Sequence, residues 1–161
     1  MIPRLPRHGA VEVVVDAPPE AVWAVLADVT RIGEWSHECS RAEWLGGATA
    51  AAPGVRFRGA NEAGRIRWAR VCTLRVVDAP RELAWRTHGP RLLGDSTDWT
   101  VRLEPAGAAT RIRQEFTVVS LPAPVDHLIA TVLPAHRDRL PALRGDLERL
   151  GEVAATVASS C

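Results

Sequence analysis

The chain has 161 residues, of which 20 are arginine and 19 are acidic, so its formal net charge is +1. This length suits one domain with a sizeable core, and the balanced charge argues against nucleic acid or an anionic membrane surface as a partner. Three cysteines without a CxxC spacing predict no disulfide framework. Because the sequence lacks an apolar signal core and a long apolar run, we expect a cytoplasmic protein without integral membrane association.

The first part of the sequence predicts one strand, two short helical segments and a second strand. Alternating valines over residues 10–15 are typical of a strand. Asp16 and the two prolines after it suit the start of a helix that would extend to about Asp28. A further helical segment is expected over 31–37 and the next strand over 42–45.

Five more strands are predicted, because apolar and polar residues alternate at period two in each of them. They are expected at 55–61, 65–77, 82–87, 95–103 and 110–118. The face of the longest strand that is predicted to point toward the core carries Ile66, Trp68, Arg70, Cys72, Leu74 and Val76.

The C-terminal part predicts a long amphipathic helix over about 134–157, preceded by a helical turn or two over 122–133. Its apolar stripe comprises His136, Leu140, Leu143, Leu147 and Leu150. Its outer face is expected to carry Arg137, Asp138, Arg139, Arg144, Asp146, Glu148 and Arg149. Pro134 is expected to kink or restart the helix.

This order of elements resembles the START-like (SRPBCC) superfamily, specifically its polyketide cyclase/dehydrase-like bacterial branch. The resemblance is carried by the closing helix and by VEVVVDAPPEAVWAVLADVTRIGEW, GVRFRG, RELAWR and DWTVRLEPAGAATRIRQEF. It implies an α+β helix-grip fold in which residues 1–161 form a single domain. A curved seven-stranded antiparallel sheet would wrap around the long C-terminal helix, with two short helices after the first strand. A cavity between sheet and helix is also implied.

Two sets of inward residues are candidates for binding a ligand in such a cavity. The aromatic side chains offer flat apolar surface for a planar molecule; they are Phe57, Trp68, Trp85 and Trp99. The polar side chains would need a partner if buried; they are Asn61, Arg70, Gln114 and His136. Both sets could instead be ordinary core residues.

Arg70 requires an acceptor if it is buried, and Glu38 is the nearest candidate partner that the sequence offers. The alternatives are that Arg70 extends to the cavity mouth or that the strand contains a bulge. If the protein is an enzyme, the catalytic candidates are Glu38, Arg70 and His136, with His136 the best general acid or base. His37-Glu38-Cys39 matches no metal motif, and we expect no metal and no cofactor. Cys72 is predicted to be an inert apolar residue, and Cys39 is expected near the opening.

Three functions remain open from the sequence. The first is non-covalent binding of a small, largely hydrophobic molecule that is lipid-like, aromatic or polyketide-like. The second is a polyketide cyclase or dehydratase that uses the same cavity, and the third is a protein-interaction module. A homodimer formed through a sheet edge or a helix is compatible with the sequence.

Overall fold

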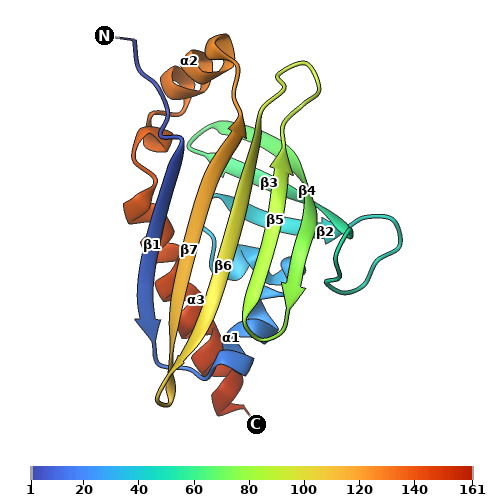
Figure 1. Cartoon of the computed structure of the whole chain (residues 1–161), viewed down its shortest axis with the longest axis vertical. Coiled ribbons are helices and arrows are strands. Elements are labelled where there is room, and N and C mark those ends of the chain that lie inside the picture. Colours follow the sequence, from blue (N-terminus) through green and yellow to red (C-terminus); the bar gives the residue numbers. More distant parts are fainter. Residues whose placement is uncertain (1, 161) are drawn as a thin grey trace.

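The computed structural model describes residues 2–160 and shows one antiparallel sheet that curves around a C-terminal helix (Figure 1). The seven strands are β1 (His8–Val15), β2 (Cys39–Trp44), β3 (Arg56–Ala63), β4 (Ile66–Asp78), β5 (Glu82–His88), β6 (Ser96–Ala106) and β7 (Ala109–Ser120). Their order in the sheet is β1-β7-β6-β5-β4-β3-β2. The expected α+β helix-grip architecture is therefore confirmed.

The helical segments lie at the places where the sequence predicted helices, with different lengths. They are α1 (Pro19–Leu26), the 3-10 helix η1 (Val29–Glu34), α2 (Ala123–Val132), the 3-10 helix η2 (Pro134–Arg137) and α3 (Leu140–Ser159). Helix α1 has a proline in its first turn, where no backbone N–H is needed. No helix within residues 2–160 is both long and apolar enough to cross a membrane.

The prediction of one continuous helix from Pro134 is wrong. The chain forms the short turn η2, leaves helical geometry at Asp138, and begins α3 at Leu140 with Pro141 in the first turn. Proline is favoured there because its ring cannot follow a preceding helical turn without a clash. His136 therefore belongs to η2 and is buried, whereas Leu140 is exposed.

A β-bulge corrects the predicted inward face of β4. Leu74 pairs with Trp85, but the next paired residues are Val76 with Ala84, so the register shifts at this point. One extra residue reverses the alternation beyond the bulge. Val76 is consequently 38% exposed, and Val77 packs against the core in its place.

The solid part of the core lies where the C-terminal half of α3 meets α1 and β1. Leu147, Leu150 and Ala154 are fully enclosed there. Gly151 allows close approach, because a Cβ atom at this position would lie 2.4 Å from a methyl carbon of Val15. The Thr110 hydroxyl donates a buried hydrogen bond of 2.7 Å to the carbonyl of Ala17 and closes this end of the sheet.

Candidate functional site

A cavity of about 540 Å³ lies between the concave face of the sheet and the segments α2, η2 and the start of α3. This volume is within the range typical of small-molecule sites. All eight residues expected to contact a ligand line the cavity: Phe57, Asn61, Trp68, Arg70, Trp85, Trp99, Gln114 and His136. Their placement agrees with the predicted strand phases, and their role in binding stays a prediction.

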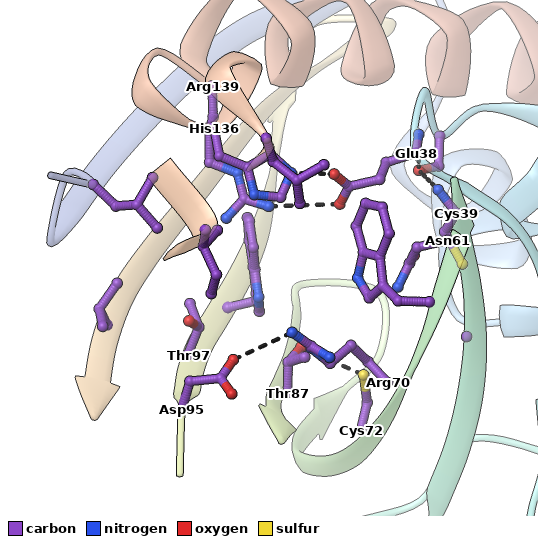
Figure 2. A pocket seen from close by; sticks show the side chains of 18 of the residues that line it. Glu38, Cys39, Asn61, Arg70, Cys72, Thr87, Asp95, Thr97, His136 and Arg139 are labelled. Carbon is purple, nitrogen blue, oxygen red and sulfur yellow. Dashed lines mark hydrogen bonds and ion pairs between the residues drawn. The ribbon is translucent and has the colours of Figure 1, made fainter. Parts of the chain in front are cut away.

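Glu38, His136 and Arg139 form a polar cluster at the side of the cavity next to the helical segments (Figure 2). His136 Nε2 contacts Glu38 Oε1, and Arg139 lies 3.5 Å from Glu38 Oε2. An ionised carboxylate can only accept, so His136 Nε2 carries the proton and donates it. The sequence placed Glu38 and His136 among the catalytic candidates, and the fold brings them into contact.

The carboxyl group of Glu38 is held in its charged form even though its side chain is only 17% exposed. Burial raises the pKa of Glu38, but the contact with His136 and the nearby guanidinium of Arg139 outweigh this effect. The pKa of Glu38 therefore lies below its usual value. The cluster thus places a fixed negative charge beside an imidazole inside a largely apolar cavity.

Arg139 was predicted on the outer face of the helix, and the structure contradicts this. Its side chain is 19% exposed and lines the cavity, with its guanidinium carbon 5.2 Å from the ring centre of Trp99 and 5.9 Å from that of Phe116. Burial lowers the pKa of Arg139, partly offset by Glu38. The break before α3 turns this residue inward, and Pro141 was the sequence signal that could have located the break.

Arg70 points into the cavity as expected, but the proposed pairing with Glu38 is wrong. Arg70 donates instead to Asp95 Oδ2 at 3.4 Å and to the carbonyl of Ala69 at 3.4 Å. Asp95 comes from the loop between β5 and β6, and Figure 2 shows this pair on the far side of the cavity from Glu38. Sequence reasoning placed Asp95 at the start of a predicted strand and did not name it as a partner of Arg70, since pairing between two strands' side chains leaves no periodic signal.

Aromatic side chains form the wall between these two polar groups. The rings of Trp85 and Trp99 are stacked, with centroids 6.3 Å apart and planes 12° from parallel. Trp99 also contacts Phe116, at 5.4 Å between centroids. The rings of Trp68 and His136 are arranged edge to face, with centroids 6.0 Å apart. The wall therefore offers broad, flat apolar surface directly beside the polar cluster.

A second polar cluster attaches the segment before β2 to α3. Asp146 accepts hydrogen bonds from the backbone N–H of His37 at 2.8 Å and from the His37 ring at 2.7 Å. Arg149 also pairs with Asp146 and donates to the carbonyl of Trp35 at 3.0 Å. The sequence predicted that Asp146 lies on the solvent-exposed face of the helix, and this is wrong because Asp146 is buried. Since Glu38 follows His37 directly, this cluster also fixes the position of Glu38.

The thiols of the described cysteines are poor candidates for chemistry. Burial raises the pKa of Cys39 to about 11 and that of Cys72 to about 12. Both are therefore protonated at neutral pH, and a thiol is a much weaker nucleophile than a thiolate. Cys161 lies outside the described residues. Between residues 2 and 160, no three histidine, cysteine or acidic side chains are grouped so that they could hold a metal ion.

Solved structures with this fold cover nearly the whole chain. Protein MLL2253 from Mesorhizobium loti is 20% identical with a TM-score of 0.66, and the match covers 93% of this chain and 98% of that one. A protein from Arthrobacter aurescens is 17% identical with a TM-score of 0.68, covering 93% and 87%. The di-domain ARO/CYC BexL from the BE-7585A biosynthetic pathway is 17% identical with a TM-score of 0.62, covering 88% and 46%. At these identities the likeness establishes the fold.

No curated protein matches the chain significantly. The sequence model of one family, described as "Polyketide cyclase / dehydrase and lipid transport", matches residues 7–154. This span contains all seven strands, the cavity-lining residues of η2 and most of α3. The chain therefore belongs to the polyketide cyclase / dehydrase and lipid transport family.

Proposed function

We propose that this protein binds a small, flat and largely apolar molecule without covalent chemistry, in the cavity between the sheet and α3. The main support is the cavity of about 540 Å³, whose aromatic wall includes the stacked pair Trp85 and Trp99. Pockets of this size and composition take up ligands mainly through apolar burial, and a few polar groups fix the orientation. Glu38, His136 and Arg139 supply those groups at one side of the cavity.

The experiment is a fluorescence titration with N-phenyl-1-naphthylamine, a neutral aromatic probe that brightens in apolar surroundings. We expect saturable binding to the wild-type protein. Thr97 lines the cavity, so Thr97→Trp fills part of it and should weaken binding at least tenfold. Thr117 lies on the exposed outer face of the same sheet, so Thr117→Trp is the matched control and should bind as the wild type does.

Two results would count against this proposal. One is the absence of saturable binding to the folded wild-type protein. The other is an equal loss of affinity in Thr97→Trp and Thr117→Trp, which would place the probe outside the cavity.

One observation favours a second function, a polyketide cyclase or dehydratase acting in the same cavity. His136 donates to a carboxylate that stays ionised, which leaves its Nδ1 nitrogen to accept a proton from a substrate carbon. Glu38 would stabilise the imidazolium that forms. The carbanion would attack a ketone carbon of the same substrate, and the proton held by His136 would pass to the alkoxide that forms. Removal of a second proton from the same substrate carbon by His136, and its transfer to the new hydroxyl, would then expel water.

This second function is tested with a short poly-β-carbonyl thioester, by following the loss of one water by mass spectrometry. If the protein is an enzyme, Glu38→Gln should lower turnover by about 100-fold or more while N-phenyl-1-naphthylamine still binds. The absence of water loss with the wild-type protein would leave binding as the function. Equal turnover by wild type and Glu38→Gln would remove this pair from the mechanism.

A further inference from the structure

The two arginines of the cavity differ in how their N–H groups are used. Arg70 donates to Asp95 and to the backbone carbonyl of Ala69. Arg139 has the ion pair with Glu38 at 3.5 Å, and within residues 2–160 its side chain makes no hydrogen bond. A guanidinium carries five N–H donors and no acceptor. Arg139 therefore brings free donors to the cavity.

Within residues 2–160, Glu38 is the one acidic side chain paired with Arg139. Glu38 Oε1 contacts His136, and Glu38 Oε2 is the atom that faces Arg139. The rings of Trp99 and Phe116 cover one side of the guanidinium and offer no strong acceptor. The N–H groups of Arg139 that Glu38 does not use are therefore available to a molecule that enters the cavity and brings an acceptor.

The charge at this side of the cavity favours an anionic acceptor. Glu38 is set against the guanidinium of Arg139 and the imidazole of His136. Asp146, the other acid at this side of the lining, is already paired with His37 and Arg149. Arg139 is also the residue immediately before α3, a helix of 20 residues with no acidic residue in its first turn and no side-chain cap. The positive end of the helix dipole therefore adds to the charge of Arg139 and is opposed by no acid of its own.

We infer that the molecule bound here is a flat aromatic acid, whose ionised oxygen contacts Arg139 while its ring lies against the tryptophan wall. This inference rests on the proposed function and narrows the ligand class. Arg139 stands over Trp99, which is itself stacked on Trp85. An acid group and an attached planar ring can thus contact Arg139 and the wall together. Arg139 is the residue that determines specificity for the acid.

The test compares 2-naphthoic acid with its methyl ester by calorimetric titration at neutral pH, where the acid is ionised. The two molecules share the same ring and differ in the charged oxygen. A hydrogen bond to a charged group changes affinity by about tenfold to 100-fold, so we expect the wild-type protein to prefer the acid by that factor. Arg139→Gln should remove the preference mainly by weakening binding of the acid.

Arg144→Gln is the matched control. Arg144 lies near the start of α3, but its side chain is exposed and donates to the backbone carbonyl of Glu12. It should keep the preference for the acid. Circular dichroism establishes that both variants are folded, and Arg139→Lys serves as a second variant that keeps the charge if Arg139→Gln is unstable. Lysine should retain part of the preference.

The possible failures are distinguishable. Equal affinity of the wild type for acid and ester, or an unchanged preference in Arg139→Gln, overturns the inference and leaves the proposed function in place. Binding of N-phenyl-1-naphthylamine but of neither naphthoate has the same meaning. If the folded wild-type protein binds none of the three molecules, the proposed function fails together with the inference.

Discussion

The two ends of the space between α3 and the sheet differ in what fills them. At the closed end, Gly151 of α3 lies directly against Val15 of β1, and Leu150 is fully enclosed. At the hollow end, the start of α3 and η2 stand off from β4, β5 and β6 around a cavity of about 540 Å³. Small and branched apolar side chains fill the first end, and tryptophan, arginine and histidine line the second.

If the cavity binds a ligand as we propose, folding stability and ligand binding depend on different parts of the same helix. Close-packed apolar contacts give most of the folding free energy, and they are concentrated where Leu147, Leu150 and Ala154 are buried. The hollow end instead contains groups that are costly to enclose, such as Glu38 and Arg139. We expect mutations at the closed end to change stability, and mutations at the hollow end to change binding.

The largest effect is expected for Leu150→Ala at the closed end. Removal of a fully enclosed leucine should lower the free energy of unfolding by about 2–5 kcal/mol. Urea denaturation followed by circular dichroism measures this loss. The affinity of the folded variant for N-phenyl-1-naphthylamine should stay at the wild-type value. A loss below about 1 kcal/mol, or a clear drop in affinity, would contradict the separation of the two ends.

The next effect concerns Asp146, which connects α3 to the segment before β2 through hydrogen bonds from His37. Asp146→Asn replaces a buried charged acceptor by a neutral amide, so the free energy of unfolding should fall by about 1–3 kcal/mol. Glu148→Gln is the matched control, because Glu148 is exposed on the same helix and should change stability by less than about 0.5 kcal/mol. Similar losses in both variants would remove Asp146 from its role in joining α3 to the segment before β2.

The same pair predicts a pH dependence. The hydrogen bond from His37 to Asp146 raises the pKa of His37 above its ordinary value, against the opposing effect of burial. The folded state therefore binds the proton more tightly than the unfolded state does. The resulting stability is complete below the pKa of an unfolded histidine, about 6.5, and is lost as the pH rises through the higher pKa of folded His37. Denaturation at a series of pH values should show this loss in the wild type and a weaker one in Asp146→Asn.

A smaller effect is expected for Trp85→Leu at the hollow end. Loss of the stacked wall should weaken binding of N-phenyl-1-naphthylamine by about threefold to tenfold, since aromatic pairs contribute about 0.5–1.5 kcal/mol. Trp44→Leu is the matched control, because Trp44 packs on Phe57 outside the cavity lining. Equal losses of affinity in the two variants would argue against Trp85 as a binding surface.

The last effect concerns the thiols, and it changes a reaction rate while stability stays the same. The pKa of Cys39 is raised by burial from 9.0 to about 11, so its thiolate fraction at neutral pH should be on the order of 100-fold lower than in the unfolded chain. Alkylation by iodoacetamide, read at Cys39 and Cys72 by peptide mapping, should be correspondingly slow in the folded protein and fast in urea. Rapid labelling of the folded protein would show that water reaches the hollow end freely.

The strands and their inward faces could be predicted from the sequence because period-two alternation is a local signal. Phe57, Trp85, Trp99 and Gln114 were placed correctly on that basis. A bulge in this strand was considered as an alternative, but its position between Leu74 and Val76 could not be predicted, because an extra residue in one strand is visible only against its partner. The same sequence pattern is compatible with either face beyond that point.

The polar part of the site was predicted only in part, because pairings depend on loops and on helix ends. Glu38 and His136 were named, but their contact arises from η2, a turn that was read as part of one long helix. Arg139 and Asp146 were read as surface residues, since charged side chains on an amphipathic helix usually face water. Their burial reflects where α3 begins and how closely the segment before β2 approaches it.

The joint between η2 and α3 has a consequence for how this protein could acquire new ligands. Arg139 lies at the bend just before α3, whereas α3 itself packs against β1 through Gly151. A change of a few degrees in the backbone at Asp138 and Arg139 would move the guanidinium of Arg139 and leave the packing of Gly151 against β1 unchanged. If a ligand oxygen contacts Arg139 as we propose, substitutions at these two residues would change which oxygen is contacted without altering the packing of α3 on β1.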